Sequence, residues 1–351
     1  MINLNTYCWN DKLNQQKQQS IHKNLPHGRV TIVHKTCYEV ISEEGLYQCE
    51  LTGNMMYGRS HFDFPCTGDW VIFQPFEANK GYILDRLPRE RTLYRKKSGE
   101  TTDKQAIASH IDKAFIVQSL DYNFNVRRVE RFMTQIVEEN ITPILILNKA
   151  DLNFDGDNVR ESIKHLATKM PIYYTSIHNS ESVSILRKSI SEGETVIFVG
   201  SSGVGKSSLI NTLTDQQILE TSEISISTGK GRHTSTRREM ILMEGSGVLI
   251  DTPGVREFGL AISSSDSLLE TLQFSDYVGS CRFKDCTHTN EPGCAVLEAL
   301  KSGVIDRAVY ESYLKLQKEV EHFNTSEVER RRKGKSLAKL IKDVKKQKGI
   351  S

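Results

Sequence analysis

A glycine-rich segment near the middle of the chain has the residue types and spacing of a phosphate-binding loop. The letters GSSGVGKS at residues 200–207 match G-x-x-x-x-G-K-S, between an apolar run and a helical pattern. Glycines let backbone N–H groups turn toward phosphate oxygens at a helix N-terminus. Lys206 would neutralise the β- and γ-phosphates, and the Ser207 hydroxyl would ligate Mg²⁺. The expected nucleotide-binding set here is Gly200, Ser201, Ser202, Gly203, Val204, Gly205, Lys206, Ser207 and Ser208.

Two downstream segments complete a triphosphate site. The letters DTPG at residues 251–254 follow an apolar run, so Asp251 can hold Mg²⁺ through water and the Gly254 N–H can reach the γ-phosphate. Residues 229–236, with the letters GKGRHTST, lie between the phosphate loop and this motif. A threonine there could complete the magnesium shell only while the γ-phosphate is bound. Thr234 is the preferred ligand and Thr236 is its alternative.

Another motif indicates which base the nucleotide carries. The letters NKAD stand at residues 148–151, after an apolar run. The Asp151 carboxylate can accept hydrogen bonds from guanine N1–H and N2–H₂, a donor pair that adenine lacks. Asn148 can contact the base N7, and the stem of Lys149 can cover the ring. One predicted strand later, the Ser176 backbone N–H would meet guanine O6. The expected base-binding set is Asn148, Lys149, Ala150, Asp151 and Ser176.

The motifs stand in an unusual order. In an ordinary regulatory GTPase the phosphate loop comes first, whereas here the base motif precedes it. A sheet tolerates such circular permutation because the termini of a domain often lie close together. The γ-phosphate-sensing segment then ends the nucleotide domain, so its motion can pass directly to the next domain.

Three cysteines and one histidine cluster within fourteen residues: Cys281, Cys286, His288 and Cys294. Three thiolates and one imidazole, without a carboxylate, suit one tetrahedral structural Zn²⁺ that has no open position for catalysis. The chain has seven cysteines, and the other four are scattered. This usage fits a reducing compartment and a metal site better than a disulfide framework.

Strand and helix patterns divide the chain into three parts. Residues 28–90 alternate β-branched or aromatic runs with turn signals, which predicts about five strands and suits an OB-type barrel, with another small β-domain as the alternative. Residues 91–110 are polar and predict a linker. Residues 111–262 alternate strands and helices, which predicts a mostly parallel sheet covered on both faces. Residues 263–325 are mainly helical around the zinc motif. The predicted fold class is multidomain α/β, with an N-terminal OB-type β-barrel, a central circularly permuted P-loop GTPase domain and a C-terminal mainly helical zinc-binding domain.

Both ends of the chain are polar. Residues 1–27 are rich in Asn and Gln and have no apolar core, so they predict a flexible leader rather than a secretory signal. Residues 326–351 form a basic tail, which is typical either of an arm for polyanions or of a solvated terminus. No apolar run approaches the roughly 20 residues that cross a bilayer. We therefore expect a cytoplasmic protein, a monomer, with no membrane partner.

In combination and order, these motifs resemble the ribosome small-subunit-dependent GTPase A family, circularly permuted GTPases that assist late assembly of the small ribosomal subunit. The resemblance extends from about Val30 to about Phe323, and Gly68-Asp69-Trp70-Val71 and the letters DTPGVREFG at residues 251–259 also carry it. It implies slow hydrolysis of GTP to GDP and phosphate, stimulation by the 30S subunit, and subsequent dissociation. It also implies binding to 16S ribosomal RNA.

The resemblance further implies a catalytic assignment. In this family a histidine before the switch threonines takes part in hydrolysis, and His233 stands at that place. Val255 follows the DTPG motif, where many GTPases carry a water-orienting glutamine. Valine cannot orient water, so His233 or a group of the ribosome must do so. The expected catalytic set is His233, Thr234 and Lys206.

Two other functions compete with this interpretation. In the first, the chain is an RNA-binding protein whose nucleotide only stabilises the fold, and RNA affinity is then the same with GTP and GDP. The intact set of Lys206, Ser207 and Asp251 argues against it. In the second, the chain is a P-loop ATPase or kinase, and the base motif at residues 148–151 argues against that.

Overall fold

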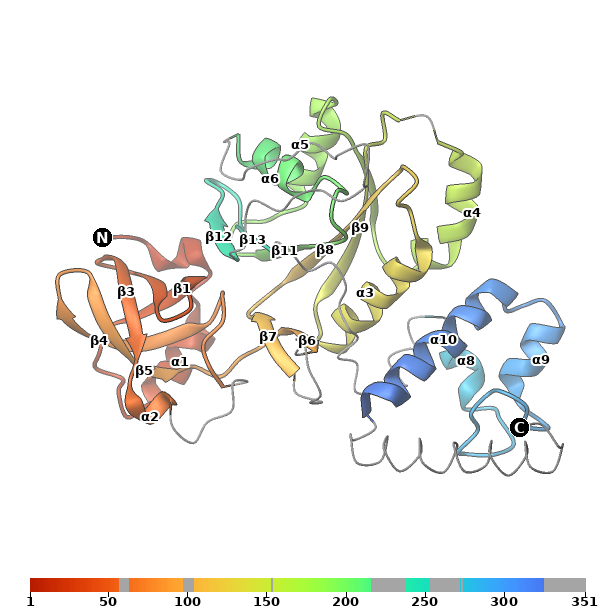
Figure 1. Cartoon of the computed structure of the whole chain (residues 1–351), viewed down its shortest axis with the longest axis horizontal. Coiled ribbons are helices and arrows are strands. Elements are labelled where there is room, and N and C mark those ends of the chain that lie inside the picture. The colour runs from red at the N-terminus through yellow and green to blue at the C-terminus, as the bar shows by residue number, and fades with distance from the viewer. Residues whose placement is uncertain are drawn as a thin grey trace, which may run out of the picture.

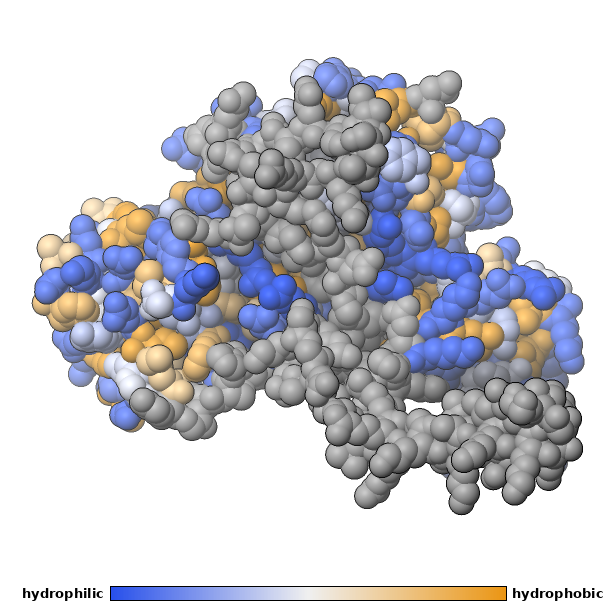
Figure 2. All heavy atoms as spheres, viewed as in Figure 1, coloured by the Kyte–Doolittle hydropathy of each residue, from blue (hydrophilic) through white to orange (hydrophobic). Residues whose placement is uncertain are grey.

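The computed structural model describes residues 1–56, 63–96, 104–152, 154–215, 238–252, 272 and 274–324 of the 351-residue chain. A small barrel, a central body of strands and helices, and a group of C-terminal helices follow one another (Figure 1). On the face seen in Figure 2, hydrophilic residues cover much of the coloured surface and interrupt the apolar patches. No helix in these described ranges is long and apolar enough to cross a membrane.

Five strands form the N-terminal barrel, and their pairing closes it. β1 (His27–Val33) pairs with both β2 (Tyr38–Ser42) and β4 (Trp70–Glu77). β3 (Gly45–Leu51) pairs with β2 and lies parallel to β5 (Lys80–Arg86), which pairs with β4. One face of every strand points inward, so the core is built from alternate residues. The interior includes Val30, Val40, Cys49, Met55 from the short helix α2 (Gly53–Met56), Val71, Phe73 and Ile83. The predicted barrel is confirmed.

The prediction of a flexible leader over residues 1–27 is wrong for its first two-thirds. A 3-10 helix, η1 (Leu4–Tyr7), and α1 (Asp11–Gln19) pack on the outside of the barrel. Leu4 and Leu13 are buried against Trp70. The side chains of Asn3 and Asn10 cap the two helices. Few apolar residues anchor the segment, so its amphipathic signal is too sparse to see in the sequence.

The predicted linker at residues 91–110 also contains regular structure. β6 (Leu93–Lys96) and β7 (Lys104–Ala108) pair as an antiparallel two-stranded sheet. Leu93, Ile107 and Ala108 are buried in the main core of the central body. The polar composition of the segment concealed a strand pair whose burial depends on a few apolar residues.

Six strands form the central sheet, in the order β10-β9-β8-β11-β13-β12. Their bounds are β8 (Lys113–Ser119), β9 (Thr142–Asn148), β10 (Ile172–Thr175), β11 (Thr195–Val199), β12 (Glu239–Leu242) and β13 (Val248–Asp251). All pairings from β10 to β13 are parallel, and only β12 is antiparallel to its neighbour. The carboxyl ends of five strands therefore meet at one edge, where α/β proteins bind ligands.

Helices cover both faces of this sheet, as the sequence predicts. α3 (Val126–Glu138) and α4 (Gly156–Ala167) bury their apolar faces in one cluster, with residues such as Met133 and Ile163. α5 (Ser180–Lys188) and α6 (Lys206–Thr214) contribute to a second cluster, with residues such as Leu186 and Leu209. Strand residues alternate between the two clusters, because successive side chains of a strand point to opposite faces.

Buried charges and one strand pair join the barrel to the central sheet. β1 of the barrel pairs with β12 of the sheet at Ile32 and Glu239. Arg29 is fully buried, and its guanidinium donates to Tyr7 O (2.7 Å), Gly68 O (3.1 Å) and Thr195 Oγ1 (2.9 Å). These acceptors belong to the N-terminal segment, the barrel and the strand that leads to the phosphate loop. Arg29 therefore holds three separate segments of the chain together.

Asp69, from the Gly68-Asp69-Trp70-Val71 sequence, lies at the same junction. Its carboxylate is fully buried and accepts hydrogen bonds from Arg89 Nη2 (2.7 Å), Ser109 Oγ (2.6 Å) and the Cys66 N–H (2.8 Å). Burial acts to raise the pKa of Asp69, but the hydrogen bond and charge of Arg89 lower it below its ordinary value. This stabilisation is therefore present at neutral pH and is lost as the pH falls through the folded pKa.

The C-terminal body is helical. It comprises α8 (Ser275–Val278), α9 (Ala295–Lys301) and α10 (Arg307–Asn324). α10 packs inward through one apolar face that includes Tyr313, Leu316 and Val320. The T-shaped pair of Phe274 and Tyr313, with ring centroids 5.1 Å apart, lies in this core.

Replacing Asp69 by alanine should lower the free energy of unfolding by about 3–5 kcal/mol, because it leaves the charge of Arg89 buried without its carboxylate. Urea unfolding followed by circular dichroism measures this loss. Asp157→Ala is the control, since that side chain is 97% exposed and pairs only weakly with Arg160 (3.4 Å). Equal stability of the Asp69 and Asp157 variants would contradict the prediction.

Candidate nucleotide site and metal centre

The phosphate loop joins β11 to α6 and requires glycine at several positions. Gly200, Gly203 and Gly205 have φ angles of +151°, +80° and +91°. A Cβ atom on Gly200 would lie 2.3 Å from Val117 O, and one on Gly205 would lie 2.4 Å from Asn148 Nδ2. At Gly200 and Gly205, the positive φ angle and the lack of space for a Cβ atom therefore both require glycine. Ser201 and Ser202 belong to the loop, and Ser207 and Ser208 belong to the first turn of α6.

Lys206 lies over the carbonyl groups of its own loop. Its Nζ donates to Gly200 O (2.8 Å) and Ser201 O (2.7 Å). Burial lowers the pKa of Lys206 to about 8, against the opposing effect of the Asp251 charge. A phosphate group bound here would place a negative charge beside the Lys206 ammonium. It would thereby raise the pKa of Lys206 again.

Asp251 ends β13 beside the phosphate loop, because β13 pairs with β11 at Asp251 and Phe198. Burial raises the pKa of Asp251 to about 6, and Lys206 counteracts this only partly. Among the described residues, neither buried carboxylate oxygen has a well-aligned hydrogen-bond partner. Such a carboxylate, at the end of the strand beside the phosphate loop, has the donor chemistry that suits a hydrated Mg²⁺ ion. Thr252 Oγ1 donates to Phe198 O (2.6 Å) and fixes the end of the strand.

The base motif at the end of β9 is hydrogen-bonded directly to the phosphate loop. Asn148 Nδ2 donates to Val204 O (2.9 Å), and Lys149 Nζ donates to Gly203 O (2.9 Å). Adjacent residues of one motif thus bond adjacent carbonyl groups of the other. Lys149 has a φ of +59°, an uncommon value for a residue with a side chain. The two motifs are separated by some fifty residues in sequence and form one unit in space.

The remaining base-motif residues lie between β9 and β10. The Ala150 N–H donates to Thr175 O (3.0 Å), and Asp151 follows it at the surface. A hydrogen bond from Ser176 lowers the pKa of Asp151, so this carboxylate is ionised at neutral pH and can accept hydrogen bonds. The Ser176 backbone N–H donates to Ser182 Oγ (3.2 Å) in this structure. The predicted contact of that N–H with guanine O6 would have to replace this bond.

The predicted switch residues lie outside the described part of the chain. They are His233, Thr234, the alternative Thr236, Gly254 and Val255. The catalytic assignment of His233 and the choice between the two threonines therefore stay predictions.

Thr175 is a residue of the site that the sequence analysis missed. Its Oγ1 donates to Asn148 Oδ1 (3.1 Å), which orients the amide so that its nitrogen faces Val204 O. Thr175 is fully buried at the end of β10, next to Asn148 at the end of β9. The sequence signal that could have identified Thr175 is a hydroxyl-bearing side chain at the last position of the strand that follows the base motif.

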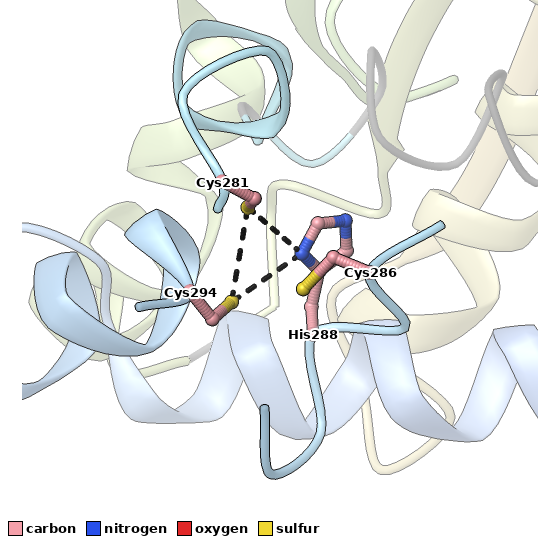
Figure 3. A group of neighbouring side chains, drawn as sticks. All are labelled: Cys281, Cys286, His288 and Cys294. Carbon is pink, nitrogen blue, oxygen red and sulfur yellow. Dashed lines mark hydrogen bonds between the residues drawn. The ribbon is translucent and has the colours of Figure 1, made fainter. Parts of the chain in front are cut away.

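The predicted metal ligands come together in the C-terminal body. Cys281, Cys286, His288 and Cys294 point toward one another, and their ligand atoms all lie within 4.8 Å of each other (Figure 3). The sulfur atoms of Cys281 and Cys294 are 3.9 Å apart, and they lie 3.5 Å and 3.4 Å from His288 Nδ1. Tetrahedral zinc, with bonds of about 2.0–2.3 Å, separates its ligand atoms by about 3.4–3.8 Å. The cluster is therefore compatible with a zinc site.

The surroundings of the cluster fix its geometry. Tyr310 OH, from α10, donates to His288 O (2.7 Å), and His288 has a φ of +60°. Cys294 precedes α9 and is buried with Val296 and Tyr313 in the helical core. A metal ion held here would join the irregular segment at residues 281–294 to the helices.

Together, the strand order, the phosphate loop and the attached base motif define a P-loop GTPase with circularly permuted motifs. A family model described as RsgA GTPase matches residues 86–261. The chain belongs to the RsgA GTPase family.

Relatives match nearly the whole chain. It is 64% identical over 346 residues to "Small ribosomal subunit biogenesis GTPase RsgA 1" of Bacteroides thetaiotaomicron, which covers 99% of this chain and 98% of that protein. The protein of the same name from Oceanobacillus iheyensis is 37% identical over 320 residues, with 88% and 91% covered.

Solved structures agree with this fold. The crystal structure of YjeQ from Thermotoga maritima matches with a TM-score of 0.63 and 26% identity, over 84% of this chain and 98% of that one. The crystal structure of YloQ, titled a circularly permuted GTPase, matches with a TM-score of 0.62 and 23% identity, over 88% and 99%. The second likeness supports the fold alone.

Replacing Asp151 by asparagine should weaken GTP binding about 10- to 100-fold, because an amide cannot accept both guanine hydrogen bonds. Xanthosine triphosphate should then bind better than GTP, since its 2-oxo group can accept from the new amide. Competition against a fluorescent guanine nucleotide measures both affinities. Asp155→Asn is the control, because asparagine caps a helix as well as aspartate does. Unchanged preference for guanine would show that Asp151 does not read the base.

Purified protein should contain one zinc ion per chain, and Cys294→Ser should lose it. The C-terminal helices should then unfold at a lower temperature, because Cys294 joins the ion to their core. Metal analysis and thermal unfolding check this, with Cys37→Ser as the control, since Cys37 lies in the barrel outside the cluster. Full zinc content in the Cys294 variant would contradict the assignment.

Proposed function

We propose that this protein is a GTPase that binds the small ribosomal subunit and assists its late maturation. It hydrolyses GTP to GDP and phosphate when the 30S subunit stimulates it, and it then dissociates. The observation that carries the proposal is the 64% identity, over 99% of the chain, to a protein named as a small ribosomal subunit biogenesis GTPase. The intact nucleotide motifs support it, because a binding protein without turnover would not need Lys206 together with Asp251.

The chemistry of the site follows from the charges that surround the phosphates. Bound Mg²⁺ would neutralise the β- and γ-phosphates, with Ser207 as a ligand and Asp251 holding its water. Lys206 would leave its loop carbonyl groups and contact the phosphates. Thr234, or Thr236 in its place, and the Gly254 N–H would sense the γ-phosphate. His233, or a group of the ribosome, would orient the attacking water, since Val255 cannot.

We propose domain limits from the sequence patterns, corrected for the helices within residues 1–27 and the strand pair within residues 91–110. The barrel covers residues 28–90, the GTPase domain 111–262, the zinc-binding domain 263–325 and the basic tail 326–351. The barrel, the zinc-binding domain and the tail would contact 16S ribosomal RNA. One Zn²⁺ ion would stabilise the C-terminal body, and the protein would act as a monomer in the cytoplasm.

Cys281 follows Asp251 after only 29 intervening residues. A change at the γ-phosphate therefore has a short covalent path to the zinc-binding domain. Loss of the γ-phosphate would release the DTPG segment and, through it, would alter the docking of the C-terminal body on the subunit. This coupling would be a mechanistic consequence of the permuted order of the motifs.

Steady-state hydrolysis with and without purified small subunits tests the proposal. We expect GTP turnover to rise about 10-fold or more with mature 30S subunits, because ordering of a loosely held catalytic group accelerates such reactions strongly. ATP is the nucleotide control and 50S subunits are the particle control. Stimulation that disappears in His233→Ala would assign the water-orienting role to this chain.

Two results would refute the proposal. If 30S subunits leave GTP turnover unchanged, the chain is not activated by its proposed partner. If RNA or 30S affinity is the same with GTP and GDP, nucleotide serves only the stability of the fold.

A further inference from the structure

A short loop after β8 contacts both nucleotide motifs, although it carries neither. This loop, residues 120–125, connects β8 to α3 and is called the brace loop below. Asp121 Oδ2 accepts a hydrogen bond from Lys149 Nζ (2.9 Å). The same ammonium donates to Gly203 O (2.9 Å). The carboxylate and the phosphate loop thus hold the Lys149 head group between them.

Asp121 is itself fixed in place. Its Oδ1 accepts from Ser119 Oγ (2.7 Å) and from the Asn123 N–H (2.9 Å). Burial would raise the pKa of Asp121, but the hydrogen bonds from Lys149 and Ser119 lower it below its usual value. The side chain is 14% exposed, and that of Lys149 is 26% exposed. The ion pair is therefore screened from water only in part, and its orientation matters more than its strength.

Asn123 forms a second contact between the brace loop and the phosphate loop. Its Nδ2 donates to Ser202 O (3.3 Å). Arg128, in the first turn of α3, donates to Asn123 O (3.2 Å) and Oδ1 (3.1 Å) and so holds the amide in its orientation. Three consecutive carbonyl groups of the phosphate loop, those of Ser202, Gly203 and Val204, then accept bonds from outside the loop.

We propose that Asp121 and Asn123 are positioning residues of the guanine-nucleotide site. Asp121 keeps the Lys149 head group anchored, so that the apolar stem of this lysine lies ready to cover the base. Asn123 keeps the phosphate loop in the conformation that receives phosphates. Both residues act on groups that GTP and GDP share, and both therefore set affinity for either nucleotide. The inference rests on the GTP-binding part of the proposed function and is independent of the ribosomal partner.

The structure favours this role over a purely structural one. Asp121 stabilises Lys149, which has a left-handed backbone and reaches from the end of β9 to the phosphate loop. A lysine without a fixed head group samples many rotamers, and binding must then restrict them. Anchoring by Asp121 removes that cost before the nucleotide arrives.

Nucleotide binding by the full-length, zinc-loaded protein tests the proposal, with fluorescent GDP and a non-hydrolysable GTP analogue as probes. Asp121→Asn should weaken both affinities by a similar factor, about 3- to 10-fold, and should raise the KM for GTP more than it lowers kcat. Asp121→Glu should restore part of the loss because it restores the charge. Asp157→Asn is the matched control on the exposed surface of α4.

A double-mutant cycle with Lys149→Met separates positioning from general stability. Methionine keeps an apolar stem and removes the ammonium, so Asp121→Asn should change affinity less than about 2-fold in this background. The same loss in both backgrounds would overturn the role of Asp121. Asn123→Ala should also weaken GDP and GTP alike, and unchanged binding in this variant would overturn the role of Asn123.

These outcomes are distinct from a failure of the proposed function. If wild-type protein binds GTP but 30S subunits do not stimulate it, the ribosomal proposal fails and the cycle still decides on the brace loop. If Asp121→Asn binds as wild type while 30S stimulation is intact, only the positioning role fails. Thermal unfolding of each variant without nucleotide shows whether a loss of binding merely reflects unfolding.

Discussion

The constraint on which the rest of this structure depends is the common direction of five neighbouring strands. Since β10, β9, β8, β11 and β13 run parallel, all their carboxyl ends reach one edge of the sheet. Whatever follows each strand is brought to that edge, regardless of its order along the chain. The base motif follows β9, the phosphate loop follows β11 and Asp251 ends β13. Permutation of the sequence therefore leaves the spatial site intact.

Buried charges impose a second constraint, at the junction of barrel and sheet. Arg29 and the pair of Asp69 and Arg89 take charge out of water, which is tolerated only where hydrogen bonds surround it. Their partners come from segments far apart in sequence, so each bond is also a long-range contact. Because hydrogen bonds are directional, such contacts favour one placement of the barrel relative to the sheet. Apolar contacts alone distinguish poorly between alternative placements. The strand before the phosphate loop is attached to the barrel in this way through Thr195.

The features that could be predicted most reliably from the sequence are the short motifs. The phosphate loop, the base motif and the metal ligands each depend on residue types at fixed spacing, and all of their described members lie where the spacing implies. The N-terminal helices and the β6–β7 pair were missed because a few anchors such as Leu13 and Ile107 carry their burial. Contacts such as Asp121 with Lys149 were also out of reach, because they join loops that only the folded sheet brings together.

The pairing of β1 with β12 has a consequence for how the protein avoids self-association. β12 is the last strand of the central sheet on that side, and its outward backbone groups would otherwise be available to another chain. The barrel covers this edge at Ile32 and Glu239. At the opposite edge, β10 has four residues, as β12 does, and a strand this short offers few backbone groups for pairing. The barrel thus occupies the edge strand of the central sheet that would otherwise be open to pairing with another chain.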